Sequence, residues 1–267
     1  MQKEMSALYR AAIWNNTASL AVLETAPLTK ELAARHRLSE SAADALGRVL
    51  TCTAYLCGWL EERESYSVSV SGNGLLGKIH AFGNGELRLC GSVERDLPAD
   101  WQADLLSCVG SKGYLSVVRS GGKGLPFSGM CALAKGDIAA DFTAYFEESE
   151  QRPTAIALYE GGGVFVQPLT GADESVLLRA RAAVRSCLPS MSAREILAAF
   201  GAEHAEKRSV SFGCTCSREK AEQAVLSLGE DAARAVLASE GGLSVHCHEC
   251  NCDYDFTQED INALFAK

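Results

Sequence analysis

Several features that would place this chain in common functional classes are missing from its sequence. It has only 6 prolines in 267 residues, which argues against long disordered tracts. The uncharged apolar stretch at residues 49–60 is too short to span a bilayer. The start, residues 1–5, is polar and lacks the apolar core of a secretory signal. We therefore expect a soluble, cytoplasmic protein with no membrane partner.

The chain also lacks positive charge. Its formal net charge is −9, and residues 211–267 contain four basic residues against ten acidic ones. A module that binds nucleic acid needs the opposite sign, because basic side chains release counterions from the phosphates. The charge therefore predicts that the protein has no nucleic-acid partner.

No nucleotide-binding motif is present with the spacing and context that it requires. Residues 72–77 match GxGxxG, but that fingerprint needs a helix to begin at its third glycine. We expect a strand there, so these glycines are interpreted as turn residues. The glycine-rich residues 120–124 lack the spacing of a phosphate-binding loop. ATP-driven work is not expected.

Cysteine, in contrast, is abundant, with 11 residues. Six of them are scattered singly: Cys52, Cys57, Cys90, Cys108, Cys131 and Cys187. An odd, scattered set fits a reducing cytosol better than a secreted disulfide framework. Cys52 and Cys57 are interpreted as small core residues of a helix.

Four further cysteines form two close pairs, a CxC at Cys214 and Cys216 and a CxxC at Cys247 and Cys250. Four thiolates are the number that a closed tetrahedral zinc site needs. Metal binding readily offsets the entropy of closing the long loop between the pairs. We predict that these four residues bind one Zn²⁺ per chain.

Three neighbouring residues are alternative ligands. His246 and His248 flank Cys247 and could coordinate zinc in principle, but we interpret them as surface residues. Cys252 forms a second CxC with Cys250, so it could substitute as a ligand or shuffle a disulfide. We interpret Cys252 as neither a metal ligand nor a disulfide partner.

The periodicity of the chain predicts an α+β fold. The first part contains a helix at residues 39–63, strands at 65–71, 76–82 and 86–90 in a meander, strands at 114–118 and 127–133, a helix at 137–150 and a hairpin at 154–168. Residues 175–200 are helical with a break at 188–190. Two short helices at 217–228 and 230–239, a hairpin with the CxxC on its turn and a last helix complete the chain. We predict a mixed α/β core domain at 1–172 for client binding and dimerisation, a helical linker at 173–210 and a zinc-binding redox-switch module at 211–267.

Residues 212–219, the helical insert and Cys247-His248-Glu249-Cys250 together resemble the heat shock protein 33 family. These are redox-regulated, ATP-independent holdase chaperones of bacteria. The likeness continues through residues 45–48, 72–77 and 144–151 and covers nearly the whole chain. Asn251-Cys252 departs from the family, which commonly has glycine after the CxxC.

The resemblance implies a chaperone and not an enzyme. In the reduced state such a protein binds zinc and is inactive. Oxidation joins Cys214 to Cys216 and Cys247 to Cys250, releases the zinc and lets exposed apolar surface hold unfolded or partly folded clients. A homodimer is expected when the protein is activated. Because a disulfide across one residue is strained, we expect the CxxC to oxidise before the CxC.

Two other functions remain open from the residues alone. The CxxC could belong to a thiol–disulfide oxidoreductase, although such enzymes place it at a helix N-terminus. Alternatively, the zinc could be a permanent structural cross-link in an adaptor protein that binds a protein partner and never switches.

Overall fold

The structure is a computed structural model that describes residues 5–98, 101–122, 126–202 and 204–266. By its internal contacts the chain divides into two compact units, Met1–Gly213 (unit 1) and Cys214–Lys267 (unit 2). Both units combine helices with mainly antiparallel sheet, which confirms the α+β fold class. The polar start at residues 1–5 and the glycine-rich residues 120–124 lie partly outside the described residues.

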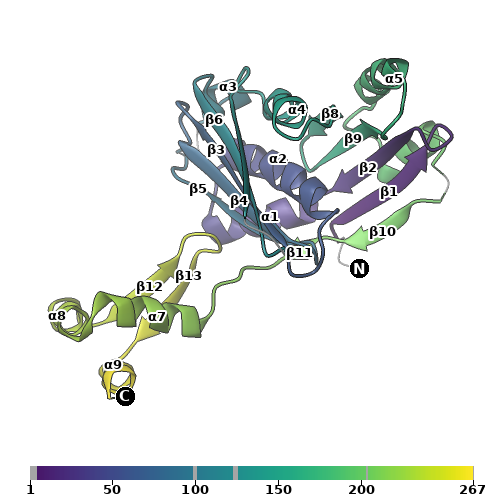
Figure 1. Ribbon diagram of the computed structural model, residues 1–267. Helices are drawn as coiled ribbons and strands as arrows, with labels where there is room; N and C mark the ends of the chain where they lie inside the picture. Colours follow the sequence, from purple (N-terminus) through teal and green to yellow (C-terminus); the bar gives the residue numbers. More distant parts are fainter. Residues whose placement is uncertain (1–4, 99–100, 123–125, 203, 267) are drawn as a thin grey trace. The chain divides into compact units, whose positions relative to one another are not determined.

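Five antiparallel strands form sheet A of unit 1 (Figure 1). Their order is β10 (Glu206–Ser209), β1 (Ala7–Ile13), β2 (Ala18–Glu24), β9 (Gly162–Pro168) and β8 (Ala155–Tyr159). In the central strand β2, Leu20 and Val22 join one core cluster while Ala21 and Leu23 join another. A strand buried on both faces has no alternation of polar and apolar residues. This is why periodicity did not reveal β2 in the sequence.

Six strands form sheet B, also in unit 1, in the order β11 (Ser211–Phe212), β5 (Arg88–Val93), β4 (Lys78–Asn84), β3 (Ser65–Gly72), β6 (Gly113–Ser120) and β7 (Phe127–Ala132). The pairs are antiparallel except β11 with β5. The predicted meander is confirmed in β3, β4 and β5, although β4 and β5 begin two residues later than expected. In β3, Tyr66, Val68 and Val70 are buried while the intervening serines are partly exposed, as strict alternation predicts.

The helices α1 (Ala26–His36), α2 (Glu40–Cys57), α3 (Leu105–Val109) and α4 (Ile138–Glu148) also belong to unit 1. α2 lies between the two sheets, and its buried face shares one core cluster with both of them (Figure 1). Cys52 and Cys57 are fully buried there, which confirms their interpretation as core residues. The ring of Tyr55 stacks on Phe165 of sheet A, with 4.2 Å between centroids.

The prediction that this helix continues to residue 63 is wrong, because α2 ends at Cys57. Its C-cap is Gly58, whose carbonyl accepts hydrogen bonds from Arg10 at 2.5 Å and Arg208 at 3.2 Å. Both arginines come from strands of sheet A. The end of the helix is therefore determined by long-range contacts that its local periodicity does not contain.

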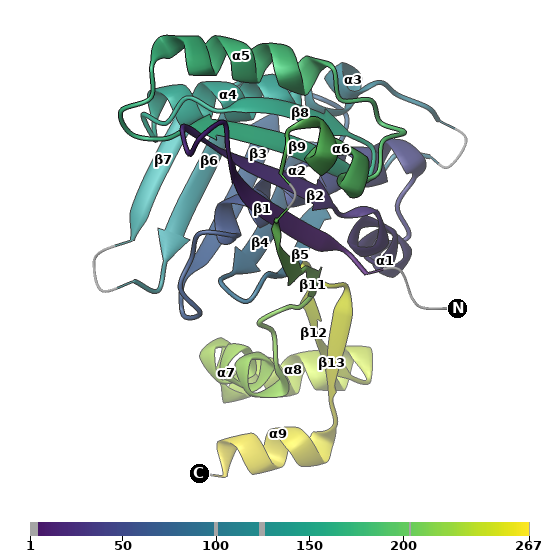
Figure 2. The ribbon, with the colours of Figure 1, turned by 90° about the vertical axis from the view of Figure 1, so that its right-hand side faces the viewer.

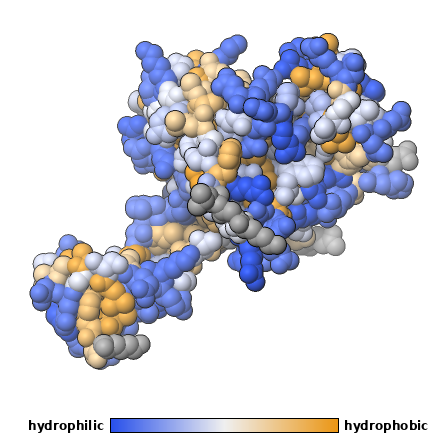
Figure 3. All heavy atoms as spheres, viewed as in Figure 1, coloured by the Kyte–Doolittle hydropathy of each residue, from blue (hydrophilic) through white to orange (hydrophobic). Residues whose placement is uncertain are grey.

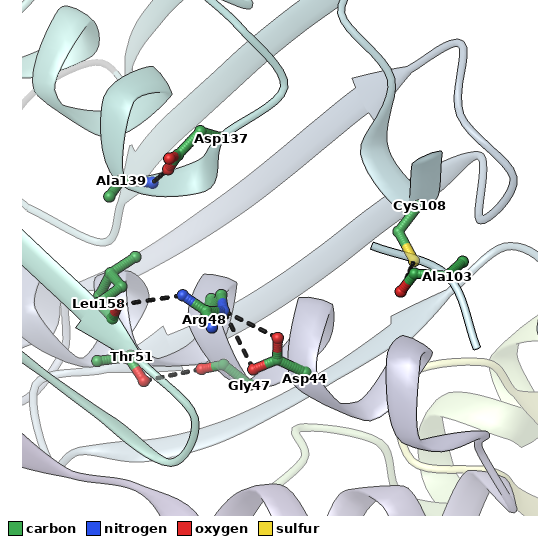
Figure 4. Close-up of polar contacts among 9 residues, drawn as sticks. All are labelled: Asp44, Gly47, Arg48, Thr51, Ala103, Cys108, Asp137, Ala139 and Leu158. Carbon is green, nitrogen blue, oxygen red and sulfur yellow. Dashed lines mark hydrogen bonds and ion pairs between the residues drawn. The ribbon is translucent and has the colours of Figure 1, made fainter. Parts of the chain in front are cut away.

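Arg48 connects α2 to sheet A (Figure 4). Its Nε lies 3.0 Å from both carboxylate oxygens of Asp44, and its Nη1 donates to the carbonyl of Leu158 in β8 at 3.1 Å. Gly47, one residue earlier, faces α1, where a Cβ would lie only 2.8 Å from Thr29 Cγ2. Gly47 therefore lets α1 approach α2 closely, and Arg48 anchors α2 to sheet A.

The GxGxxG stretch at residues 72–77 is structural, as predicted. β4 follows it, and Gly77 has a φ of 67°, which favours glycine. The N–H of Gly74 donates to Val109 O at 3.0 Å, and a Cβ at Gly72 or Gly74 would collide with the backbone at the end of α3. These glycines therefore let the chain pack against α3.

Residues 173–210, predicted to be a helical linker, lie in unit 1 in this structure. They form α5 (Glu174–Arg185), α6 (Ala193–Ala199) and β10, with the expected break between the helices and a capping box at Ser192 and Glu195. The two helices pack on sheet A through Val184, Ile196 and Phe200 (Figure 2). The division at 1–172, 173–210 and 211–267 stays a prediction.

Unit 2 consists of α7 (Arg218–Leu228), α8 (Glu230–Glu240), β12 (Leu243–Cys247), β13 (Cys252–Phe256) and α9 (Gln258–Phe265). The order matches the predicted one, with α7 and α8 joined at Gly229 and a capping box at Thr257 and Asp260. Its core contains Ala221, Val225, Ala233, Leu237, Leu243, Phe256 and Ile261. Among the described residues of both units, no helix has the length and apolar character needed to cross a membrane.

Candidate metal centre

Unit 2 brings the two cysteine pairs together. The Sγ atoms of Cys214, Cys216, Cys247 and Cys250 all lie within 4.8 Å of one another. Cys214 Sγ is 3.7 Å from Cys247 Sγ, and Cys216 Sγ is 3.3 Å from Cys250 Sγ. Both of these contacts link one pair to the other, so the cluster joins the start of the unit to its hairpin.

The donor set fits a tetrahedral metal site. With metal–sulfur bonds of about 2.3 Å, a tetrahedron places its sulfurs about 3.8 Å apart. The separations of 3.3 and 3.7 Å are close to that value and much longer than a disulfide bond. The four cysteines can hold a metal ion, and soft thiolate donors favour a soft or borderline cation.

The CxxC pair is positioned by a β-hairpin. In the register of β12 and β13, Cys247 is opposite Cys252, and Cys250 lies in the turn between them. The N–H groups of Cys250 and Asn251 both donate to Cys247 O, at 3.3 and 2.8 Å. Asn251 has a φ of 57°, in the left-handed region that asparagine tolerates. The turn therefore bends Cys250 back towards the CxC pair.

The CxC pair immediately precedes a helix. Ser217 is the N-cap of α7 and accepts a hydrogen bond from the N–H of Lys220 at 3.3 Å. Lys220 also donates through Nζ to Thr215 O, between the two cysteines, at 2.6 Å. A helix N-terminus and an ammonium group both favour nearby negative charge. The sequence therefore folds so that cationic features lie beside the thiols of Cys214 and Cys216.

The ionisation of the cysteines is uneven. Burial raises the pKa of Cys214 to about 11 and also raises the pKa of Cys250. Burial acts on Cys216 too, but hydrogen bonds from Tyr254 and the neighbouring cysteines outweigh it and lower its pKa. Four thiolates in this space repel one another, so a bound cation is the arrangement that lets all of them stay ionised.

The three alternative ligands lie outside the cluster. His246 and His248 are exposed, as expected, and their rings contact each other with 4.9 Å between centroids. His246 Nδ1 is 2.7 Å from a carboxylate oxygen of Asp253. Cys252 is half-buried, and its Sγ points to Cys250 O at 3.8 Å. The identity of the ligands stays a prediction, which the geometry supports for the four clustered cysteines.

Tyr254 also belongs to the site, although no motif in the sequence marks it. Its hydroxyl donates to Cys216 Sγ at 3.1 Å. Alternation along β13 places Tyr254 on the same face as Phe256, whose side chain is buried in the core of unit 2. This alternation predicts on which face of the hairpin the Tyr254 ring lies. No local pattern predicts that its hydroxyl reaches a cysteine 38 residues earlier.

Comparisons with known proteins agree over almost the full chain. A family model described as Hsp33 protein matches residues 6–257. A 33 kDa chaperonin from Oceanobacillus iheyensis is 30% identical over 96% of this chain and 98% of its own length. Another from Bacillus cereus is 31% identical over 91% and 92%. The crystal structure of a 33 kDa chaperonin from Thermotoga maritima superimposes with a TM-score of 0.87, at 26% identity and 98% coverage of both chains.

Proposed function

Because the chain belongs to the Hsp33 family of chaperones, which are not enzymes, we propose that it is a redox-regulated holdase that needs no ATP. In the reduced state Cys214, Cys216, Cys247 and Cys250 bind one Zn²⁺ and the chain is inactive. Oxidation converts them to two disulfides and allows the chain to hold unfolding clients. The observation that carries this proposal is the convergence of four sulfurs within 4.8 Å in the smaller unit.

The proposed switch depends on what the cysteines hold together. Bound zinc would keep the four sulfurs as thiolates and cross-link the two ends of the α7–α8 insert. Among the described residues, the core cluster of unit 2 contains seven buried side chains, two of them alanine, so this cross-link is a major part of its stability. The pairing Cys214–Cys216 with Cys247–Cys250, which the resemblance implies, would remove all four metal donors and leave each disulfide within one short segment. The insert then has no link between its ends.

Apolar side chains for client binding are available on unit 1. Met130 on β7 is 65% exposed and Leu178 on α5 is 61% exposed. On the face drawn in Figure 3, hydrophobic residues lie in separate areas. Further apolar side chains are buried between sheet A and the helices α5 and α6 that cover it. We propose that their release enlarges the surface that unfolded proteins contact, since large apolar patches mark interaction sites.

Two further parts of the proposal come from the sequence and the family resemblance. The odd, scattered cysteines favour a reducing compartment, which we take to be the cytoplasm. The activated form is proposed to be a homodimer. An oxidoreductase is disfavoured by the position of the CxxC, which lies on a hairpin turn and not at the N-terminus of a helix.

The test compares reduced, zinc-loaded protein with peroxide-treated protein in an assay of client aggregation without ATP. We expect suppression only after oxidation, together with metal loss measured by a chromogenic chelator. Cys250→Ser should not hold the metal, whereas Cys252→Ser should switch like the natural chain. Equal suppression in both redox states with metal retained would indicate a non-switching adaptor. Catalysed reduction of insulin would indicate an oxidoreductase.

A further inference from the structure

Tyr254 lies at an unusual point of unit 2. It is half-buried in the middle of β13, opposite Val245 of β12, and its ring packs against the core of the unit. Its hydroxyl donates to Cys216 Sγ at 3.1 Å. A ring fixed by packing keeps its hydroxyl in place, so this contact is built into the fold of the hairpin.

Hydrogen bonds reach both sulfurs of the CxC pair. Cys214 Sγ accepts one from the backbone N–H of Cys216 at 3.4 Å, and Cys216 Sγ accepts the one from Tyr254. Cys214 Sγ and Cys216 Sγ also contact the sulfurs of Cys247 and Cys250, at 3.7 and 3.3 Å. The bond from Tyr254 differs from the other in that it comes from a side chain outside the four cysteines.

We propose that Tyr254 is a positioning residue of the redox switch: its hydroxyl holds Cys216 in a less nucleophilic state and makes the CxC pair the slower one to oxidise. This inference rests on the proposed redox function. A hydrogen bond to a thiolate draws electron density from the sulfur lone pair, and groups around a metal site commonly tune its ligands in this way. The contact must weaken when the sulfur attacks an oxidant.

The step that Tyr254 slows is the reaction of Cys216 with a peroxide. The thiolate attacks one peroxide oxygen, so that an S–O bond forms, the O–O bond breaks and hydroxide leaves. Sulfur loses two electrons and the peroxide gains them. The thiolate of Cys214 then attacks the sulfenic sulfur, forming the S–S bond and releasing a second hydroxide. In total, two thiolates and one hydrogen peroxide give one disulfide and two hydroxide ions.

The test is Tyr254→Phe in the full chain, which removes the hydroxyl and keeps the packed ring. The matched control is Tyr114→Phe, an exposed tyrosine on β6 of unit 1. After brief exposure to hydrogen peroxide, quenching and digestion, mass spectrometry measures the oxidation of each pair. We expect the CxC pair to oxidise about tenfold faster in Tyr254→Phe, since one hydrogen bond to a charged group is lost. The CxxC rate and the control should remain unchanged.

A second measurement checks the hydrogen bond without any oxidation. Thiolate-bound Co²⁺ absorbs through sulfur-to-metal charge transfer, whose energy falls when a hydrogen bond to sulfur is removed. We expect Tyr254→Phe to shift this band to longer wavelength while the ligand-field bands keep their tetrahedral pattern. Site-specific 3-fluorotyrosine, a stronger donor of the same shape, should slow oxidation of the CxC pair, which covers the case that the phenylalanine variant folds poorly.

The outcomes separate this inference from the proposed function. Equal CxC oxidation rates in the natural chain and Tyr254→Phe, with an unshifted charge-transfer band, would overturn the role of Tyr254 and leave the redox switch standing. A natural chain that keeps all four thiols under peroxide would instead overturn the switch itself. Faster oxidation of both pairs in the variant would show general loosening of unit 2 and would also contradict the inference.

Discussion

Metal removal under reducing conditions should unfold Cys214–Lys267 and leave unit 1 folded. The core of unit 2 has seven buried residues, and domains of this size rarely derive more than about 3–5 kcal/mol from their core. Structural zinc contributes about 10–16 kcal/mol in small peptides. A loss of even about 4 kcal/mol multiplies the unfolded fraction roughly a thousandfold. The apo unit is therefore expected to be mostly unfolded.

Limited proteolysis with trypsin measures this directly. Arg218, Lys220 and Arg234 lie in α7 and α8, where helical structure and the fold of the unit protect them. When the unit opens and closes faster than trypsin cuts, the cleavage rate at these sites is proportional to the population of the unfolded form. We expect rapid cutting at these sites after treatment with a strong chelator and a phosphine reductant. Arg48, within unit 1, should stay protected, and restoring zinc should restore protection in unit 2.

Two results would refute this reasoning. Slow cleavage of α7 and α8 in chelated, reduced protein would show that the apolar core of unit 2 is sufficient without a metal. Simultaneous cleavage within α2 would show that the two units unfold together, contrary to their separate cores. The reductant is essential, because disulfides formed during chelation would otherwise add the effect of oxidation to the effect of metal loss.

Three other predictions concern single sites. Cys250→Ser should abolish stoichiometric zinc binding, measured by metal analysis, whereas Cys252→Ser should retain it, because Cys252 lies outside the cluster. Arg48→Met should lower the free energy of unfolding of unit 1 by about 2–3 kcal/mol in denaturant titrations, since it breaks the contacts with Asp44 and β8. Burial raises the pKa of Cys57 from 9.0 to about 12, so the folded chain retains its proton longer than the unfolded chain. The free energy of unfolding should therefore fall as pH rises through this window, and less steeply in Cys57→Ala.

Unit 2 was largely predictable because its signals are local. Glycine at position 229 separates two helices, and Thr257 with Asp260 caps the last one through both of its expected hydrogen bonds. The spacing of the cysteines indicated a common site, and the fold brings their sulfurs together.

Unit 1 was less predictable where tertiary contacts decide the structure. β2 faces two core clusters at once, so its sequence contains no periodicity of two. α2 ends at Cys57 because arginines from β1 and β10 bind the Gly58 carbonyl. β10 itself, Glu206–Ser209, reads as a polar connection, and only its pairing with β1 makes it a strand. Each of these features depends on residues more than forty positions away.

In the candidate site, too, some features follow from the local sequence and others depend on tertiary contacts. Spacing alone identified which thiols can share a metal, because a CxC and a CxxC each present two sulfurs on one side of a short segment. It could not show that the sulfurs differ in their surroundings. That difference includes the Tyr254 hydroxyl, which the register of β13 brings to Cys216. We propose that two pairs that look equivalent in sequence are thereby unequal in reactivity, which would let the steps of the proposed switch occur in order.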